Sequence, residues 1–256
     1  MCARCYAENM PGAVAIASVL GAAAATTGIL AYGIAGRSSQ MFGESVYRGP
    51  GQRRSLALTF DDGPSDSTPI LLDLLGEQRV PATFFQCGIN VRRHPAVARR
   101  VLHEGHEIGN HTYSHPHLCP YPGRKPIFKS RSFIYNEFAV TQDVIADETG
   151  FEPKLLRAPY GLRWFGVAEA QERLGLLGVM WTVIGHDWNW NAEQISALIL
   201  ARARPGGIIC LHDGRDIQEN PDVTPMLQAV WHIVPALKAK GYRFETVSQL
   251  LEPDFE

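Results

Sequence analysis

Short apolar runs alternate with longer amphipathic stretches from residue 53 to residue 251, and this alternation limits the fold more than any other feature of the chain. Seven apolar runs indicate buried strands, at 56–60, 82–86, 107–109, 154–157, 176–181, 207–211 and 242–246. Between them, apolar residues three and four apart predict helices at 68–78, 95–104, 133–149, 164–173, 192–202 and 224–240. Strict strand–helix alternation produces a parallel sheet with helices outside it. Seven units, without a dinucleotide-binding glycine pattern after the first strand, favour an α/β fold of the (β/α) barrel type with one unit missing over an open doubly wound sheet.

The amino-terminal region differs from the rest of the chain in composition. No charged residue occurs between Glu8 and Arg37, and the mostly apolar stretch 11–36 exceeds the roughly 20 residues that cross a bilayer. Three interpretations compete: a signal-anchor, a signal peptide cleaved after Ala35, and a buried core helix, of which length favours the first two. We therefore divide the chain into a signal-anchor or signal peptide (1–36), a Gly/Pro/Ser/Arg-rich linker (37–52), a globular domain (53–251) and a tail (252–256).

Charge and composition exclude other classes of protein. The formal net charge is −2, from 24 Lys and Arg residues against 26 Asp and Glu residues, so the chain is not a polybasic nucleic-acid binder. With 45% hydrophobic residues it is too apolar for a disordered chain. Five cysteines are too few for a disulfide framework. We interpret Cys2 and Cys5 as ordinary thiols, because no second pair follows at zinc-ligand spacing.

Reactive side chains follow the predicted strands at the point where each strand ends. The carboxyl ends of parallel strands meet on one face of a barrel, so residues over 150 positions apart are expected in one cleft. The residues in these positions are Asp61, Asp62, His111, His115, Arg157, Asp187, His212 and Asp213.

Two of these groups suggest a metal site. His111 and His115 are four residues apart, a spacing that lets both imidazoles face one metal ion, although histidines at this spacing are often only surface neighbours. Asp61 and Asp62 leave a buried strand together, and their two charges require a cation or a positive partner. A His, His, Asp set is a three-ligand zinc site with one position open for water. The alternative for 61–64 is an ordinary Asp-Gly, Gly-Pro turn.

Five segments in order resemble the motifs of the NodB-type polysaccharide deacetylases, also called family four carbohydrate esterases. The resemblance extends from about Arg53 to Leu251. It implies a distorted, incomplete (β/α)7 barrel and a metal-dependent hydrolysis of N-acetyl groups, or in some members O-acetyl groups, on sugar polymers. The segments are Thr-Phe-Asp-Asp-Gly-Pro (59–64), His-Thr-Tyr-Ser-His (111–115), Arg-Ala-Pro-Tyr-Gly (157–161), Asp-Trp (187–188) and Leu-His-Asp (211–213).

The resemblance also implies a role for each matching residue. Asp62, His111 and His115 would bind the metal, most simply Zn²⁺, with Co²⁺ or another transition metal as alternatives. Asp61 would act as the general base, and Arg157 would hold it in position. His212 would protonate the departing amine, and Asp187 would orient and charge His212. The backbone N–H of Tyr160 would stabilise the oxyanion, Trp188 would form a wall of the sugar site, and Cys210 and Leu211 would border the pocket for the acetyl methyl group.

The chain departs from the family pattern at two positions. Many relatives have an additional Asp three residues before the Asp-Trp pair, where this chain has Ile184. The family usually has a leucine two residues before the last motif's histidine, where this chain has Cys210. Neither change removes a metal ligand, the base or the acid, so we expect the chain to be active. The two changes are expected to affect the rate and the substrate preference.

Substrate and location follow from the resemblance. The expected partner is a polysaccharide with N-acetylated sugars, peptidoglycan or a chitin-like glycan, and the alternatives are an O-acetyl esterase and a membrane-tethered glycan-binding module without turnover. The basic segment 119–132 is expected to border the polymer groove. The arginines that follow the apolar stretch favour a cytoplasmic domain, but long domains translocate largely regardless of charge, so we expect the domain outside the cytoplasm, anchored or secreted. No pattern in the chain specifies an oligomeric state.

Overall fold

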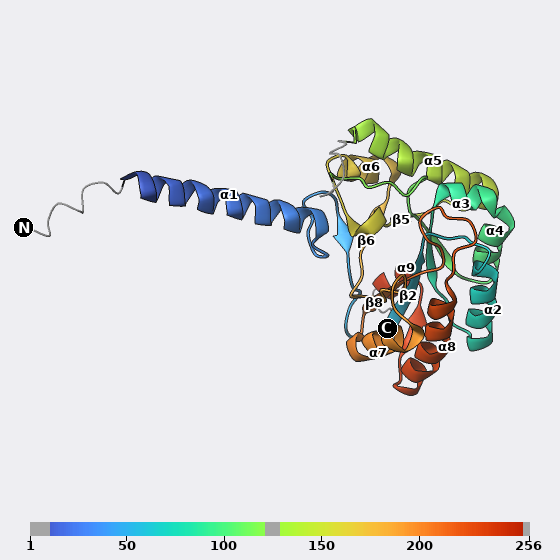
Figure 1. Cartoon of the computed structure of the whole chain (residues 1–256). Coiled ribbons are helices and arrows are strands. Elements are labelled where there is room, and N and C mark those ends of the chain that lie inside the picture. Colours follow the sequence, from blue (N-terminus) through green and yellow to red (C-terminus); the bar gives the residue numbers. More distant parts are fainter. Residues whose placement is uncertain (1–10, 121–128, 253–256) are drawn as a thin grey trace, which may run out of the picture.

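The sheet is parallel throughout its named strands and has β2 near its middle (Figure 1). The computed structural model describes residues 11–120 and 129–252, with the side chains of α1 described from residue 18. The strand order is β1-β6-β5-β4-β3-β2-β8-β7, and β9 also pairs with β2. The strands are β1 (Ser45–Val46), β2 (Ser55–Asp61), β3 (Thr83–Gln86), β4 (Glu107–Asn110), β5 (Leu155–Leu156), β6 (Leu177–Val179), β7 (Val183–Ile184), β8 (Gly207–His212) and β9 (Arg243–Glu245).

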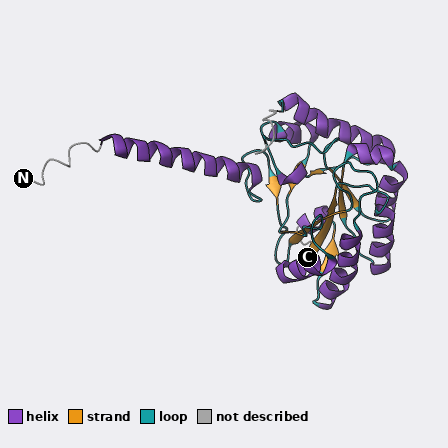
Figure 2. Ribbon diagram, viewed as in Figure 1, coloured by secondary structure: helices purple, strands orange, loops and turns teal. Residues whose placement is uncertain are grey.

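Helices cover the outer face of this curved sheet (Figure 2). Proline in the first turn begins α2, α4 and α8, a position where its missing N–H costs no hydrogen bond. A capping box of Asn191 and Gln194 begins α7, and Gly150 in the left-handed conformation ends α5. The helices of the body are α2 (Thr68–Gln78), α3 (Gly88–Arg93), α4 (Pro95–His103), α5 (Arg131–Thr149), α6 (Val167–Leu174), α7 (Ala192–Arg202), α8 (Thr224–Ala239) and α9 (Val247–Leu251), with a 3-10 turn at Pro159–Gly161.

The core consists of three clusters, of which one lies around α5 and α6 and includes Ile134, Phe138 and Val167. Of the other two clusters, the larger fills the space between the strands and the helices and includes Phe60, Leu211 and Met226. The smaller cluster lies on the inner face of the sheet, where Ala57, Phe85, Ile208, Val247 and Leu250 pack together. Because successive residues of a strand point to opposite faces, β2 and β8 supply both of these clusters.

The predicted α/β fold of the incomplete (β/α) barrel type is confirmed. Each of the seven predicted apolar runs contains a strand, and each of the six predicted helices is present. The structure adds β1 and β7, which have two residues each and are too short to show periodicity. The segment expected to be a linker contributes β1, which pairs with β6, and Arg48 forms a bridge with Gly207 of β8. This segment therefore belongs to the sheet.

Helix α1 (Pro11–Ala35) extends away from the body (Figure 1). Its window Ser18–Ala35 is long and apolar enough to cross a membrane, with a mean hydropathy of 1.5, and only 6% of it is buried. The interpretation as a buried core helix is therefore wrong. Cys2 and Cys5 lie outside the described residues, as do most of the basic segment 119–132 and the tail after residue 252.

Candidate active site

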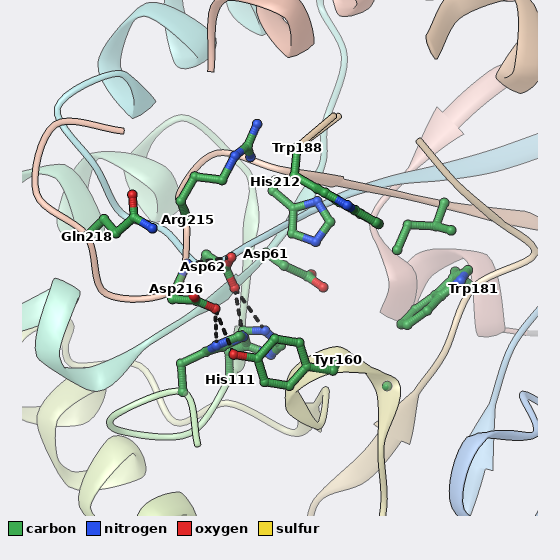
Figure 3. Close-up of a pocket in the computed structure, with 13 residues that line it drawn as sticks. Asp61, Asp62, His111, Tyr160, Trp181, Trp188, His212, Arg215, Asp216 and Gln218 are labelled. Carbon is green, nitrogen blue, oxygen red and sulfur yellow. Dashed lines mark hydrogen bonds and ion pairs between the residues drawn. The ribbon is translucent and has the colours of Figure 1, made fainter. Parts of the chain in front are cut away.

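Five of the eight predicted strand-end residues line one pocket of about 490 Å³: Asp61, Asp62, His111, His115 and His212 (Figure 3). It opens at the carboxyl ends of the parallel strands, where the barrel fold places functional side chains. Residues at the ends of β2, β7 and β8 and in the segments that follow β2, β4, β5, β6, β7 and β8 line it. The lining residues are Asp61, Asp62, His111, His115, Tyr160, Gly161, Trp181, Ile184, Trp188, His212, Arg215, Asp216 and Gln218.

A change of backbone conformation separates the two adjacent carboxylates at the end of β2. Asp61 is the last residue of the strand, whereas Asp62 is in the left-handed region with φ of 72°. Such a conformation costs a non-glycine residue about 1–3 kcal/mol and is usually retained only where the surroundings fix it. The side chain of Asn90 donates a hydrogen bond to the Asp62 carbonyl at 2.7 Å. The neighbouring carboxylates therefore face different partners.

Asp62, His111 and His115 bring three metal-ligand atoms together. The Oδ1 atom of Asp62 lies 3.2 Å from Nε2 of His111 and 3.1 Å from Nε2 of His115 (Figure 3). All three residues are buried, and their ligand atoms lie within 4.8 Å of one another. Among the described residues, none forms a hydrogen bond with Asp62 Oδ1, although the atom is buried. One carboxylate oxygen and two imidazole nitrogens around a common centre fit a divalent transition metal.

Neighbouring groups orient the ligand atoms. Nδ1 of His111 lies 2.7 Å from the carbonyl oxygen of Arg157, which can only accept, so Nε2 is left for a metal. Nδ1 of His115 lies 2.6 Å from Oδ1 of Asp216, and the Asp216 backbone N–H donates to Oδ2 of Asp62 at 2.9 Å. Asp216 thus contacts two of the three ligands.

The electrostatics of this cluster favour a positive charge at its centre. Burial lowers the pKa of His115, but the Asp62 and Asp216 carboxylates raise it to about 10. Burial raises the pKa of Asp62, but the two histidines outweigh this effect and hold that pKa well below its ordinary range. The same atoms that attract a proton here would attract a metal cation.

Glu137 of α5 organises the loop between the two histidines. Its Oε2 accepts hydrogen bonds from the backbone N–H groups of Tyr113, at 3.0 Å, and Ser114, at 2.8 Å. Its Oε1 accepts a hydrogen bond from the Ser114 hydroxyl at 2.8 Å. One buried carboxylate therefore holds the turn that places both imidazoles on the same side.

Asp61 lies in a second cluster on the inner face of the barrel. Arg157 is fully buried and donates a hydrogen bond from Nη1 to Asp61 Oδ1 at 2.6 Å and another to the Thr59 hydroxyl at 2.8 Å. The Cys210 thiol donates to Asp61 Oδ2 at 3.4 Å. Burial raises the pKa of the Cys210 thiol well above its ordinary value, so it remains a protonated donor. Asp61 is thereby fixed at both oxygens.

His212 pairs with Asp187 at the end of β8. Nδ1 of His212 lies 2.9 Å from Asp187 Oδ1, and the His212 backbone N–H donates to Asp187 Oδ2 at 2.8 Å. Burial lowers the pKa of His212, but the Asp187 carboxylate outweighs this effect and raises the pKa to about 9. The imidazole is therefore protonated at neutral pH and can act as an acid.

Aromatic and apolar side chains form the walls of the pocket. The Tyr160 ring lies edge-on to His115, with centroids 4.7 Å apart, and its hydroxyl donates to Asp216 at 3.0 Å. Trp188 is 43% exposed and lies edge-on to His212 at 5.3 Å. Ile184, which replaces a carboxylate of the family pattern, lines the pocket together with Trp181.

Two predicted substrate-contacting residues do not line the pocket. Leu211 is fully buried and packs in the larger core cluster toward the helices, because it points to the opposite face of β8 from His212. Cys210 is also fully buried and lies beneath the pocket against Asp61. Their contact with substrate stays a prediction, which would require either side chain to be reached from the pocket above it.

Comparison with known proteins gives consistent matches. The family model described as polysaccharide deacetylase matches residues 48–179. The peptidoglycan-N-acetylglucosamine deacetylase PgdA of Listeria monocytogenes is 36% identical over 200 residues, which are 77% of this chain and 39% of that protein. The chitooligosaccharide deacetylase of a Bradyrhizobium species is 35% identical, over 77% of this chain and 90% of that one.

The solved structures agree with these matches. The crystal structure of the Bc1960 peptidoglycan N-acetylglucosamine deacetylase, solved with a naphthalenyl-N-oxidanyl-benzamide ligand, superposes with a TM-score of 0.71 and 33% identity. The match covers 82% of this chain and 94% of that structure. By contrast, the present chain matches well under half of the Listeria protein's length.

Proposed function

We propose that this chain, which belongs to the polysaccharide deacetylase family, removes N-acetyl groups from N-acetylglucosamine units of a polysaccharide and releases acetate. The observation that carries the proposal is the presence of three chemical groups in one pocket. These are the Asp62, His111 and His115 set, the carboxylate of Asp61, and the protonated imidazole of His212. Amide hydrolysis needs an activated water, a proton acceptor and a proton donor.

The ligand set supports a divalent metal, and we propose Zn²⁺. Two imidazoles and one carboxylate leave a tetrahedral ion with an open position, as in catalytic zinc sites, and Co²⁺ accepts similar ligands. When bound, such an ion polarises the acetamide carbonyl and lowers the pKa of water. Asp216 and the Arg157 carbonyl would keep the histidine Nε2 atoms directed toward it.

The residues of the chain perform the proton transfers. Asp61 accepts the proton of the attacking water, and the hydrogen bonds from Arg157 and Cys210 hold its carboxylate in place. The new C–O bond forms as the carbonyl π electrons move to oxygen, and the backbone N–H of Tyr160 donates to that oxyanion. When the oxyanion collapses, the C–N bond breaks and His212 gives its proton to the leaving nitrogen. The products are acetate and a free amine on the sugar.

The pairing of His212 with Asp187 supports an amide substrate. An amine is a poor leaving group unless it is protonated, so an amidase depends on an acid, whereas an alkoxide leaves an ester more readily. A pKa near 9 keeps His212 protonated in the neutral range. A glycan-binding module without turnover would have no use for this acid together with the fixed base Asp61.

The relatives narrow the substrate class. The Listeria protein is named for peptidoglycan N-acetylglucosamine and the Bradyrhizobium protein for chitooligosaccharides, and both substrates contain N-acetylated glucosamine. Trp181 and Trp188 give the pocket apolar aromatic faces suited to packing against a sugar ring. Because such polymers lie outside the cytoplasm, we propose that the body is extracytoplasmic, anchored by α1 or secreted after its cleavage.

Acetate release from N-acetylglucosamine oligomers and from peptidoglycan tests this function. The full chain, purified in detergent, should release acetate only when supplied with Zn²⁺ or Co²⁺. Asp61→Asn should lower the rate about 10²–10⁴-fold and keep the metal content, because it removes the base and no ligand. Asp147→Asn, at an exposed position of α5, is the matched control and should retain the rate. Failure of the folded, metal-loaded chain to release acetate from either substrate would contradict the proposal.

A further inference from the structure

The carboxyl end of α1 is embedded in the body. Gly33 is buried, and a Cβ atom there would lie 2.4 Å from the sulfur of Met41 and 3.2 Å from the Phe42 ring. Phe42 in turn packs against Trp164 and Phe165, with ring centroids 5.6 Å and 4.9 Å away. Glycine at position 33 leaves room for these side chains against the helix.

Arg163 fastens the same junction by hydrogen bonds. Its side chain is 3% exposed and donates to the carbonyl oxygens of Gly36 and Ser39 and to the Ser45 hydroxyl. Its backbone N–H donates to the carbonyl of Ile34 at 3.0 Å, within the last turn of α1. These carbonyls follow a helix end, where partners outside the helix are required. A buried, multiply bonded arginine leaves no flexible spacer between helix and body.

Exposed apolar side chains surround this junction. Tyr32, Met41 and Phe165 are 53%, 50% and 52% exposed, and we call these three residues the junction collar. Along its length α1 exposes further apolar side chains, among them Val19, Leu20 and Ile29.

Two exposed arginines lie beside the collar. Arg37 follows α1 directly, and the Cα of Arg131 lies 3.1 Å from the ideal Cβ position of Gly166, the residue after Phe165. Apolar side chains bordered by arginines are typical of the interface between lipid tails and headgroup phosphates.

The length of α1 places the collar at that interface. The helix has 25 residues and is therefore about 37 Å long, whereas the hydrocarbon core of a bilayer is about 30 Å thick. If the amino-terminal part spans this core, the last turn with Tyr32 reaches the headgroup region, where aromatic residues are enriched. Met41 and Phe165 are attached to that turn by the packing of Phe42.

We propose that the junction collar inserts into the headgroup region of a phospholipid bilayer, so that the catalytic body rests directly on the membrane in one fixed orientation. The inference depends on the proposed membrane insertion of α1. It assigns to Phe165 and Met41, which belong to the body and its β1 connection, a lipid contact that the helix alone does not require.

The junction also connects the membrane to the pocket wall. Arg163 is three residues after Tyr160, and Arg37 donates to the carbonyls of Trp181 and Thr182. Tyr160 and Trp181 both line the pocket. The same segment that follows α1 therefore contacts the strand end that carries a pocket residue.

Site-directed nitroxide labels on the full chain in vesicles of phosphatidylcholine and phosphatidylglycerol test the proposal. The background carries Cys2→Ser and Cys5→Ser, while Cys87, Cys119 and Cys210 are buried and stay unmodified in the folded protein. Single labels are placed by Leu20→Cys in α1, by Phe165→Cys and Met41→Cys in the collar, and by Trp231→Cys on α8. Trp231 is 55% exposed and is the matched control for an apolar side chain of the body. Collision with oxygen reports lipid contact, and collision with a water-soluble nickel complex reports contact with water.

Three outcomes are distinguishable. The proposal expects the labels at 20, 165 and 41 all to have an oxygen-to-nickel collision ratio several-fold above that at 231. A high ratio at 20 with ratios at both 165 and 41 equal to that at 231 would overturn the collar and leave the membrane helix intact. A ratio at 20 equal to that at 231 would overturn the insertion of α1, and the collar with it. Two positions of the junction collar are labelled, so that a local disturbance of the fold by one substitution does not decide the result.

Discussion

Asp61 and Asp62 are adjacent in the chain, yet their surroundings prepare them for different tasks. The Asp61 carboxylate accepts hydrogen bonds from Arg157 and from the Cys210 thiol, and these two donors fix its orientation. The Asp62 carboxylate lies between two imidazoles and the backbone N–H of Asp216. Environment, rather than residue type, divides paired carboxylates into separate roles. Here the positive φ of Asp62 produces that division.

Asp187→Asn should shift the pH dependence of the rate. The wild-type His212 pKa is raised to about 9 from an ordinary value of 6.5, so the proton donor is present below about pH 9 and is lost as the pH rises through it. Asparagine removes the largest influence that raises this pKa and leaves burial, which lowers it, so the alkaline limb should move to lower pH. Measuring kcat/KM from pH 5 to 10 checks this. An unchanged alkaline limb would show that His212 is not the acid.

Asp216→Asn should weaken metal binding about 10–100-fold, the usual effect of removing a carboxylate that orients a ligating histidine. The variant retains the backbone N–H that donates to Asp62. A loss of metal affinity would therefore come from the missing carboxylate contact with His115. Competition with a zinc-binding dye measures the affinity. Asp143→Asn, exposed on α5, provides the control, and equal affinities in the two variants would refute the orienting role.

At the scale of elements, α5 supports the metal site from outside the pocket. Glu137 accepts three hydrogen bonds from the turn between His111 and His115. Asn110, the last residue of β4, donates to the Phe138 carbonyl of the same helix at 2.9 Å. The helix thereby holds both the strand and the turn that follows it.

Glu137→Gln should destabilise the fold by about 1–2 kcal/mol, because a neutral amide oxygen replaces a charged one as the acceptor for the backbone N–H groups of Tyr113 and Ser114, while the amide –NH₂ turns to the Ser114 hydroxyl. The same change should lower metal affinity, since the turn that places the histidines loses its anchor. Urea unfolding with and without Zn²⁺ measures both effects. Glu193→Gln, exposed in the first turn of α7, should change neither. A Glu137 variant as stable and as tightly metallated as that control would contradict this account.

Arg163→Ala should loosen the junction between α1 and the body. The change removes the donors to Gly36, Ser39 and Ser45, so residues 36–45 should become accessible to protease. Timed trypsin digestion of the full chain in detergent, with mass analysis of the fragments, should show cleavage after Arg37 at least several-fold faster than in wild type. Arg202→Ala, exposed at the end of α7, serves as the control. Equal cleavage rates in both would mean that Arg163 does not hold the junction.

Long elements were predictable, whereas short ones depended on tertiary contacts. The bounds predicted for α2 and α7 agree with the structure, because both helices have clear start signals and a regular apolar spacing. β1 and β7 escaped prediction, since a two-residue strand is defined by its partners in the sheet. Helix α3 also escaped, because it has only six residues.

At the scale of the whole molecule, the parallel arrangement explains which site residues could be predicted. Asp61, Arg157 and His212 were expected together because strand ends meet on one face, and they do. Leu211 packs in the larger core cluster, because only alternate residues of β8 face inward, and its contact with substrate stays a prediction. Asp216 lies in a loop and Glu137 lies on a helix. The spacing of these residues in the sequence does not indicate that they contact the two histidines or the turn between them.

The central position of β2 has a consequence for the order in which the protein becomes active. Asp61 forms its hydrogen bonds with Arg157, 96 residues later in the chain, and with Cys210, 149 residues later. Asp62 accepts a hydrogen bond from Asp216, 154 residues later. Contacts between such distant segments form late in folding. A ribosome must therefore add more than half of the 256 residues after the first catalytic carboxylate before the pocket can exist. Because α1 precedes all of these segments, it emerges from the ribosome before the pocket can form.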